Sequence, residues 1–133
     1  RYTDAGVNLY GNAVLASTQM IAERPQVVAA FLRAANRGIV ESFADPAAAV
    51  AAARQREPML QEQTELASWA ITRQYVGAPD TREHGLGDVK PALLAQQVEQ
   101  VAQTFGLKNA PKPDTLFNRS LLPAQAARML KNT

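Results

Sequence analysis

Residues 4–17, DAGVNLYGNAVLAS, are the only stretch of the chain whose apolar residues alternate as they do in a β-strand. One predicted face carries Val7, Leu9, Gly11, Ala13 and Leu15, and the other carries Asn8, Tyr10 and Asn12. A single strand cannot satisfy its own backbone donors and acceptors, so it needs neighbouring strands. The rest of the sequence contains no clear second strand. Either residues 4–17 are not a strand, or the sheet lies in another chain or in sequence outside these 133 residues.

The sequence after residue 17 is typical of helices. Ser17 or Thr18 can cap a short helix through Glu23, and Pro25 suits the first position of the next helix. Apolar residues in that next helix recur every three or four positions and form one stripe. The stripe consists of Val28, Phe31, Leu32, Ala35, Ile39 and Phe43.

Further along the chain, Asp45 and Pro46 repeat the same start signal before an alanine-rich helix. The apolar residues between 59 and 71 predict another helix, which ends near Gly77. Residues 78–88, APDTREHGLGD, combine two glycines and a proline with no apolar period, so they are predicted to form a loop.

Asp88 is expected to cap a helix whose apolar stripe runs from Val89 to Phe105 and which ends at Gly106. The last ten residues, 124–133, are expected to form either a short helix or a frayed tail.

Composition narrows the classes of function. With 133 residues, 47% of them hydrophobic, the chain is expected to form one domain. It has no cysteine, which excludes disulfides, thiolate catalysis and cysteine zinc sites. No apolar run approaches the ~18 residues of a membrane span. The net charge is +2, and the five basic residues after Pro91 are predicted to form a solvated basic tail and not a nucleic-acid site. They are Lys108, Lys112, Arg119, Arg128 and Lys131.

His84 is the single histidine, and acidic residues lie near it in sequence, so a metal or acid/base site can be considered. A solvated loop histidine explains the pattern without further help, and no second histidine exists to complete a His-rich site. We therefore predict no catalytic residue and no metal ligand. Trp69 and Tyr75 are expected to be partly buried in the core.

Tyr10, Gly11 and Asn12 are the candidate ligand-binding residues. Tyr10 and Asn12 lie on the polar face of an otherwise apolar predicted strand, beside a glycine that permits close approach of a backbone or a ligand. The alternative is an edge strand that faces solvent.

Five motifs in the same order resemble the C-terminal half of bacterial ABC-transporter solute-binding proteins of the aliphatic-sulfonate and thiamine-pyrimidine-precursor type. The resemblance covers roughly residues 4–123. The motifs are Tyr10-Gly11-Asn12, Glu23-Arg24-Pro25, Phe31 to Gly38, Asp45 to Ala48 and Phe117 to Pro123.

This resemblance implies an α/β, type II periplasmic-binding fold with two lobes when whole, of which this chain is a mostly α-helical part with one N-terminal strand. It implies that residues 1–17 form the return-crossover strand, 18–123 the C-terminal helical part of the first lobe, and 124–133 a tail or short terminal helix. The N-terminal half and the export signal are then expected to lie outside the sequence given.

The implied function is the capture of a small organic or anionic solute in the periplasm and its delivery to a membrane permease. By the same resemblance, Tyr10, Gly11 and Asn12 lie beside the cleft, where they can supply an aromatic wall and an amide hydrogen bond. Fungal relatives act as enzymes with pyridoxal phosphate and a cysteine-rich iron motif. Because this chain has no cysteine, that branch is disfavoured and no cofactor is expected.

Two alternatives come from other classes of protein. One is a free-standing helical interaction or regulatory-ligand module whose N-terminal strand pairs with a partner. The other is an enzyme that uses His84, for which the sequence names no reaction.

Overall fold

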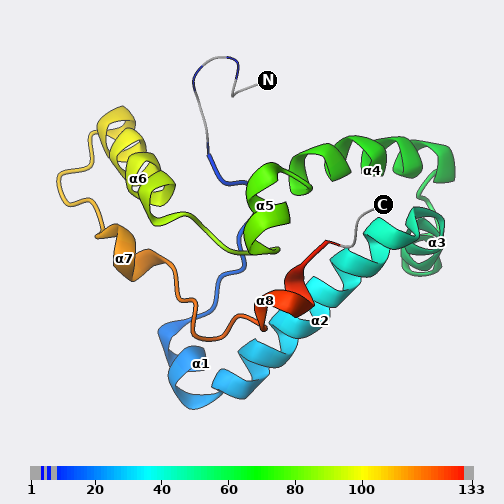
Figure 1. Cartoon of the computed structure of the whole chain (residues 1–133), viewed down its shortest axis with the longest axis horizontal. Helices are drawn as coiled ribbons and strands as arrows, with labels where there is room; N and C mark the ends of the chain where they lie inside the picture. The colour runs from blue at the N-terminus through cyan, green and yellow to red at the C-terminus, as the bar shows by residue number, and fades with distance from the viewer. Residues whose placement is uncertain (1–3, 5, 7–8, 131–133) are drawn as a thin grey trace.

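The structure is a computed structural model that describes residues 4, 6 and 9–130. Helices joined by loops make up the described residues, in an open arrangement (Figure 1). The helices are α1 (Thr18–Glu23), α2 (Pro25–Ala44), α3 (Pro46–Arg56), α4 (Glu62–Val76), α5 (Pro79–His84), α6 (Pro91–Phe105), α7 (Pro113–Leu116) and α8 (Gln125–Arg128).

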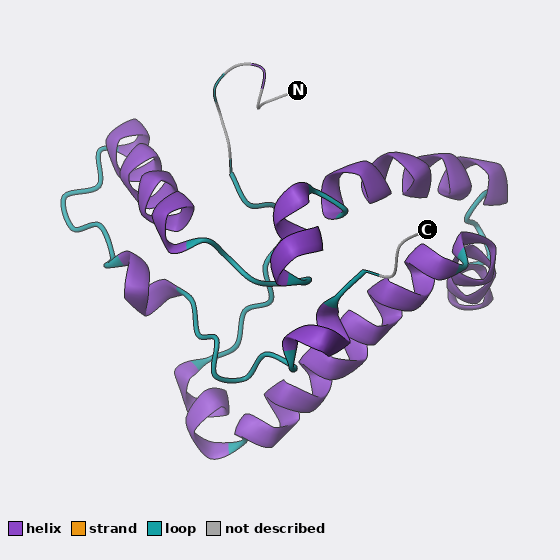
Figure 2. Ribbon diagram, viewed as in Figure 1, coloured by secondary structure: helices purple, strands orange, loops and turns teal. Residues whose placement is uncertain are grey.

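The strand predicted for residues 4–17 is not seen. Residues 9–17 form a loop that leads into α1, and no strand occurs in the part of the chain that the structure describes (Figure 2). Residues 5, 7 and 8 of the predicted strand lie outside the described residues. The physical reason is that a segment with alternating apolar residues forms a strand only when a neighbouring strand supplies its backbone hydrogen bonds.

The predicted starts of the first three helices are confirmed. The side chain of Ser17 accepts a hydrogen bond from the backbone N–H of Met20 at 3.1 Å, which caps α1. Asp45 accepts from the N–H of Ala48 at 3.0 Å and caps α3 in the same way. Pro25 and Pro46 occupy the first positions of α2 and α3.

Two predictions between α4 and α6 are wrong. Residues 79–84 form the helix α5 inside the predicted loop, and its first residue is Pro79, which is well suited to that position. Asp88 does not cap α6, because that helix starts at Pro91 and its N-cap is therefore Lys90. The carboxylate of Asp88 is two residues too early to cap the helix and binds other groups.

The apolar core is small and lies where α2, α4 and the C-terminal segment meet. Phe43, Leu86 and Leu130 are buried there, and three half-buried residues pack against them: Val40, Trp69 and Val76. The rings of Phe43 and Trp69 meet edge to face, with centroids 5.5 Å apart. The indole N–H of Trp69 donates to the carbonyl oxygen of Ser42 at 2.9 Å, which joins α4 to α2.

Much apolar surface stays uncovered. The chain exposes 9944 Å², whereas a compact monomer of 14.4 kDa exposes about 6800 Å². Phe31 on α2 is 56% exposed, and Phe105 on α6 is 73% exposed. Of the described helices, the four-residue α7 makes the most extensive contact with α6, and most residues of α6 stay exposed. No described helix combines the length and the apolar character that crossing a bilayer requires.

Candidate functional site

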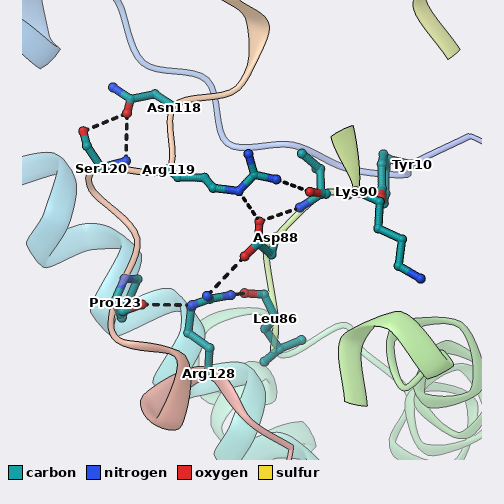
Figure 3. Close-up of polar contacts among 10 residues, drawn as sticks. Tyr10, Leu86, Asp88, Lys90, Asn118, Arg119, Ser120, Pro123 and Arg128 are labelled. Carbon is teal, nitrogen blue, oxygen red and sulfur yellow. Dashed lines mark hydrogen bonds and ion pairs between the residues drawn. The ribbon is translucent and has the colours of Figure 1, made fainter. Parts of the chain in front are cut away.

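Tyr10 is the one predicted ligand residue that the structure places against another segment. Its hydroxyl oxygen accepts a hydrogen bond of 2.7 Å from the backbone N–H of Lys90, just before α6 (Figure 3). Tyr10 is half-buried, whereas Gly11 and Asn12 are exposed, and a Cβ at Gly11 would meet nothing within 4 Å. The structure therefore joins Tyr10 to the residues before α6 and leaves its two neighbours open to solvent.

Asp88 lies at the centre of a charged cluster that we call the Asp88 cluster, consisting of Asp88, Arg119 and Arg128. Arg119 Nε donates to Asp88 Oδ1 at 2.8 Å, and Arg128 Nη2 lies 3.4 Å from Asp88 Oδ2. Figure 3 shows Asp88 between the two arginines. The cluster joins the segment before α6, the loop after α7 and the helix α8, which are distant in sequence.

Arg128 is the most buried charged side chain of the cluster, at 6% exposure. Its Nη1 donates to the carbonyl oxygen of Leu86 at 2.7 Å, and its Nε donates to that of Pro123 at 2.9 Å. The backbone carbonyl of Arg128 in turn accepts from the N–H of Leu86 at 2.8 Å. Because its donors have partners, the buried guanidinium avoids most of the cost of an unpaired charge.

The backbone at Val89 is held on both sides by this cluster. Its N–H donates to Asp88 Oδ1 at 2.9 Å, and its carbonyl oxygen accepts from Arg119 Nη2. Both backbone polar groups of Val89 therefore have partners, which restrains the backbone that leads to Lys90.

At this site the pKa values of Asp88 and Lys90 are shifted. Partial burial by itself would raise the pKa of Asp88, but the hydrogen bonds from Val89 and Arg119 and the charges of both arginines lower it overall. The pKa of Lys90 is raised, chiefly by the hydrogen bond of its ammonium group to Asp80 at 2.6 Å. Asp88 is thus a carboxylate and Lys90 an ammonium group at neutral pH.

The prediction of a solvated basic tail is wrong for Arg128, which is buried, whereas Arg119 binds Asp88 but keeps 46% of its side chain exposed. Lys131 lies outside the described residues. Sequence reasoning missed this cluster. Arg119 is 31 residues and Arg128 is 40 residues from Asp88, so no helical or strand spacing connects them. Two sequence features could have pointed to the cluster. One is Asp88, an acid just before Pro91 that does not cap α6, and the other is Arg119 inside the motif from Phe117 to Pro123.

The motif from Phe117 to Pro123 has a structural role here. Asn118 Oδ1 accepts from the N–H of Ser120 at 2.9 Å and from its hydroxyl at 2.7 Å, which closes a local turn. The guanidinium of Arg119 lies over the ring of Phe117, with its central carbon 5.3 Å from the ring centroid. The turn and the ring contact orient Arg119 toward Asp88.

His84 is the last residue of α5 and is half-exposed, with Nε2 3.6 Å from Glu83 Oε2. No group of three or more metal-ligating side chains occurs among the described residues. Trp69 is half-buried as predicted, whereas Tyr75 is exposed, contrary to the prediction.

A pocket of about 350 Å³ lies between α6 and α7 and is lined mainly by apolar residues, together with Asp114 and Arg119. Another, of about 250 Å³, lies along α1. Neither is lined by Tyr10, Gly11 or Asn12. The three predicted ligand residues thus line neither of these two pockets, and their contact with a solute stays a prediction.

Comparison with known families gives one match. The model of the family described as NMT1/THI5 like matches residues 1–49. The matched range contains α1, α2 and the start of α3, together with Tyr10, Gly11 and Asn12. No curated protein and no solved structure matches the chain. Over its first 49 residues the chain is therefore similar to NMT1/THI5-like proteins, which supports its resemblance to ABC-transporter solute-binding proteins.

Proposed function

We propose that this chain is the C-terminal portion of the solute-binding component of an ABC importer. The observation that carries the proposal is the family match over residues 1–49, which contains four of the five motifs of the resemblance. In this role the protein captures a small organic or anionic solute, of the sulfonate or thiamine-precursor type, and catalyses no reaction. In this role the protein is located in the periplasm. Its partners are the solute and the membrane permease that receives the solute.

The uncovered surface supports this proposal. The chain exposes about 3100 Å² more than a compact monomer of its mass, and apolar residues of α2 and α6 contribute to that surface. An N-terminal half with a β-sheet would cover these helices and give residues 9–17 the neighbouring strand that they lack in the described structure.

The proposed mechanism is ligand-driven closure of two lobes. A solute favours the closed arrangement only to the extent that it binds that state more tightly than the open one. Tyr10, Gly11 and Asn12 would contact the solute from the crossover segment between the lobes. The Asp88 cluster would hold the segment before α6 against Tyr10.

Calorimetry on two lengths of the protein tests the proposal. We expect residues 1–133 alone to show negligible affinity for ethanesulfonate, benzoate and 4-aminopyrimidine, because half of the cleft is missing. The product of the whole gene should bind at least one of these probes with 1:1 stoichiometry. Tight 1:1 binding by residues 1–133 alone would contradict the proposal.

The alternative function is a helical interaction or regulatory-ligand module, and the same exposed segment 9–17 favours it. The coding sequence upstream of Arg1 discriminates between the two. The module requires a start codon or a domain linker just upstream, whereas the solute-binding protein requires about 150 to 200 residues of α/β pattern. An enzyme that uses His84 requires His84→Ala to abolish an activity.

A further inference from the structure

Chemistry determines the direction of the hydrogen bond at Tyr10. A backbone N–H can only donate, so the hydroxyl oxygen of Tyr10 must be the acceptor in its 2.7 Å contact with Lys90. The phenolic proton is therefore not used in this contact. No acceptor for that proton occurs among the residues that the structure describes.

The donor that meets Tyr10 is held in place by the Asp88 cluster. Val89, the residue before Lys90, has its N–H bound to Asp88 and its carbonyl oxygen bound to Arg119. Asp88 is in turn held by Arg119 and by the buried Arg128. The cluster thus restrains the peptide unit that presents the Lys90 N–H to Tyr10.

A hydroxyl that accepts a hydrogen bond becomes a better donor, because the two bonds polarise each other. We propose that Tyr10 donates its phenolic proton to a lone-pair acceptor on the solute, and that Asp88 is the positioning residue that holds Tyr10 in this donor role. This inference rests on the proposed function and adds a preference for the chemical group of the solute that contacts Tyr10. The site selects an oxyanion, carbonyl oxygen or ring nitrogen over an ammonium group at this position.

The first part of the test uses amide NMR spectra of residues 1–133. Tyr10→Phe removes the acceptor, so the Lys90 amide proton should move upfield and exchange faster with solvent. Asp88→Asn should change the same amide, because it loosens the Val89 backbone. Tyr75→Phe and Asp114→Asn are matched controls outside this set of contacts and should leave the Lys90 signal unchanged. An unchanged Lys90 amide in Tyr10→Phe would overturn the inference.

The second part uses the product of the whole gene and the acceptor probes ethanesulfonate, benzoate and 4-aminopyrimidine, with benzylammonium as the donor probe. For an acceptor probe that binds, Tyr10→Phe should weaken affinity about 2- to 12-fold, the usual range for one lost hydrogen bond. Benzylammonium should bind the parent protein more weakly than that probe. Tyr75→Phe should bind like the parent protein.

A double-mutant cycle separates positioning from a merely structural role. Asp88→Asn should weaken binding of the acceptor probe in the parent protein but cause little further loss in Tyr10→Phe. Equal losses in both backgrounds would mean that Asp88 only stabilises the fold, and would overturn its positioning role. If the parent protein binds a probe and Tyr10→Phe binds it equally well, the inference fails and the proposed function stands. If the folded parent protein binds none of the probes, the proposed function itself fails.

Discussion

The apolar core around Phe43 and the Asp88 cluster join the same chain by opposite means. The core packs α2 against α4 and the C-terminal segment, mainly through aromatic and aliphatic contacts. The cluster joins the segments around α6, α7 and α8 through charged hydrogen bonds to one carboxylate and several carbonyl oxygens. Apolar packing tolerates small displacements of its members, whereas a charged cluster requires defined partners at defined distances. The two regions should therefore respond differently to truncation, pH and charge removal.

The largest expected effect is on the core. Phe43→Ala removes a side chain that is 4% exposed and contacts Trp69, so it should lower the free energy of unfolding by about 3 to 5 kcal/mol. Urea unfolding of residues 1–133 measures this change, and the fluorescence of the single tryptophan reports on the same contact. Phe105→Ala is the matched control on the uncovered face of α6 and should change stability by less than about 0.5 kcal/mol. Equal losses for the two variants would contradict the core described here.

The next effect concerns the cluster. Arg128→Met leaves the carbonyl oxygens of Leu86 and Pro123 without their donor, but Asp88 keeps Arg119. We expect a loss of about 2 to 3 kcal/mol in the free energy of unfolding. The matched control is Arg37→Met, because Arg37 pairs with Glu41 at 2.7 Å but its side chain is 80% exposed. The control should unfold like the parent protein. A control as damaging as Arg128→Met would mean that burial does not decide the value of these pairs.

The smallest effect is a pH dependence that the Asp88 cluster should show and the apolar core should not. The pKa of Asp88 is lower in the folded than in the unfolded chain, so the contribution of its charge is complete above its ordinary pKa of 3.8. That contribution is lost as the pH falls through the lowered value in the folded chain. The stability difference between the parent protein and Asp88→Asn should therefore be constant from about pH 7 to pH 5 and narrow below about pH 4.

Urea unfolding of both proteins across this range measures the difference, and the remaining carboxylates are common to both. Phe43→Ala should keep its difference from the parent protein over the same range, because it changes no charge. A gap for Asp88→Asn that narrows near neutral pH, or that is unchanged at pH 3, would contradict the ion pairs described for Asp88.

Local signals predicted the starts of α1, α2 and α3 and the end of α6. Ser17, Asp45, Pro25 and Pro46 mark helix starts because a cap or a proline acts within one turn of its own position. Gly106 ends α6 in the left-handed conformation, with φ of 62°, as its position after the apolar stripe predicts. Asp88 resembles a cap in sequence but does not act as one, because Pro91 sets the start of the helix two residues later than a cap at Asp88 requires.

The candidate site was predicted only in part. The sequence singled out Tyr10 from the polarity of its predicted strand face, and the structure joins that tyrosine to Lys90 through an 80-residue separation. No periodic pattern extends over such a distance. The alternating pattern of residues 9–17 describes a tendency to form a strand, and a strand forms only where another strand supplies the hydrogen bonds.

By itself, the sequence determined the helices α1, α2 and α3 with their start signals, the end of α6 at Gly106, and the similarity of the first 49 residues to NMT1/THI5-like proteins. These depend on interactions within a few residues or on motif order. Only the tertiary structure decided that Arg119 and Arg128 bind Asp88, that Tyr10 accepts from Lys90, and that the faces of α2 and α6 stay exposed. The physical reason is that ion pairing and burial depend on which distant segments meet in space.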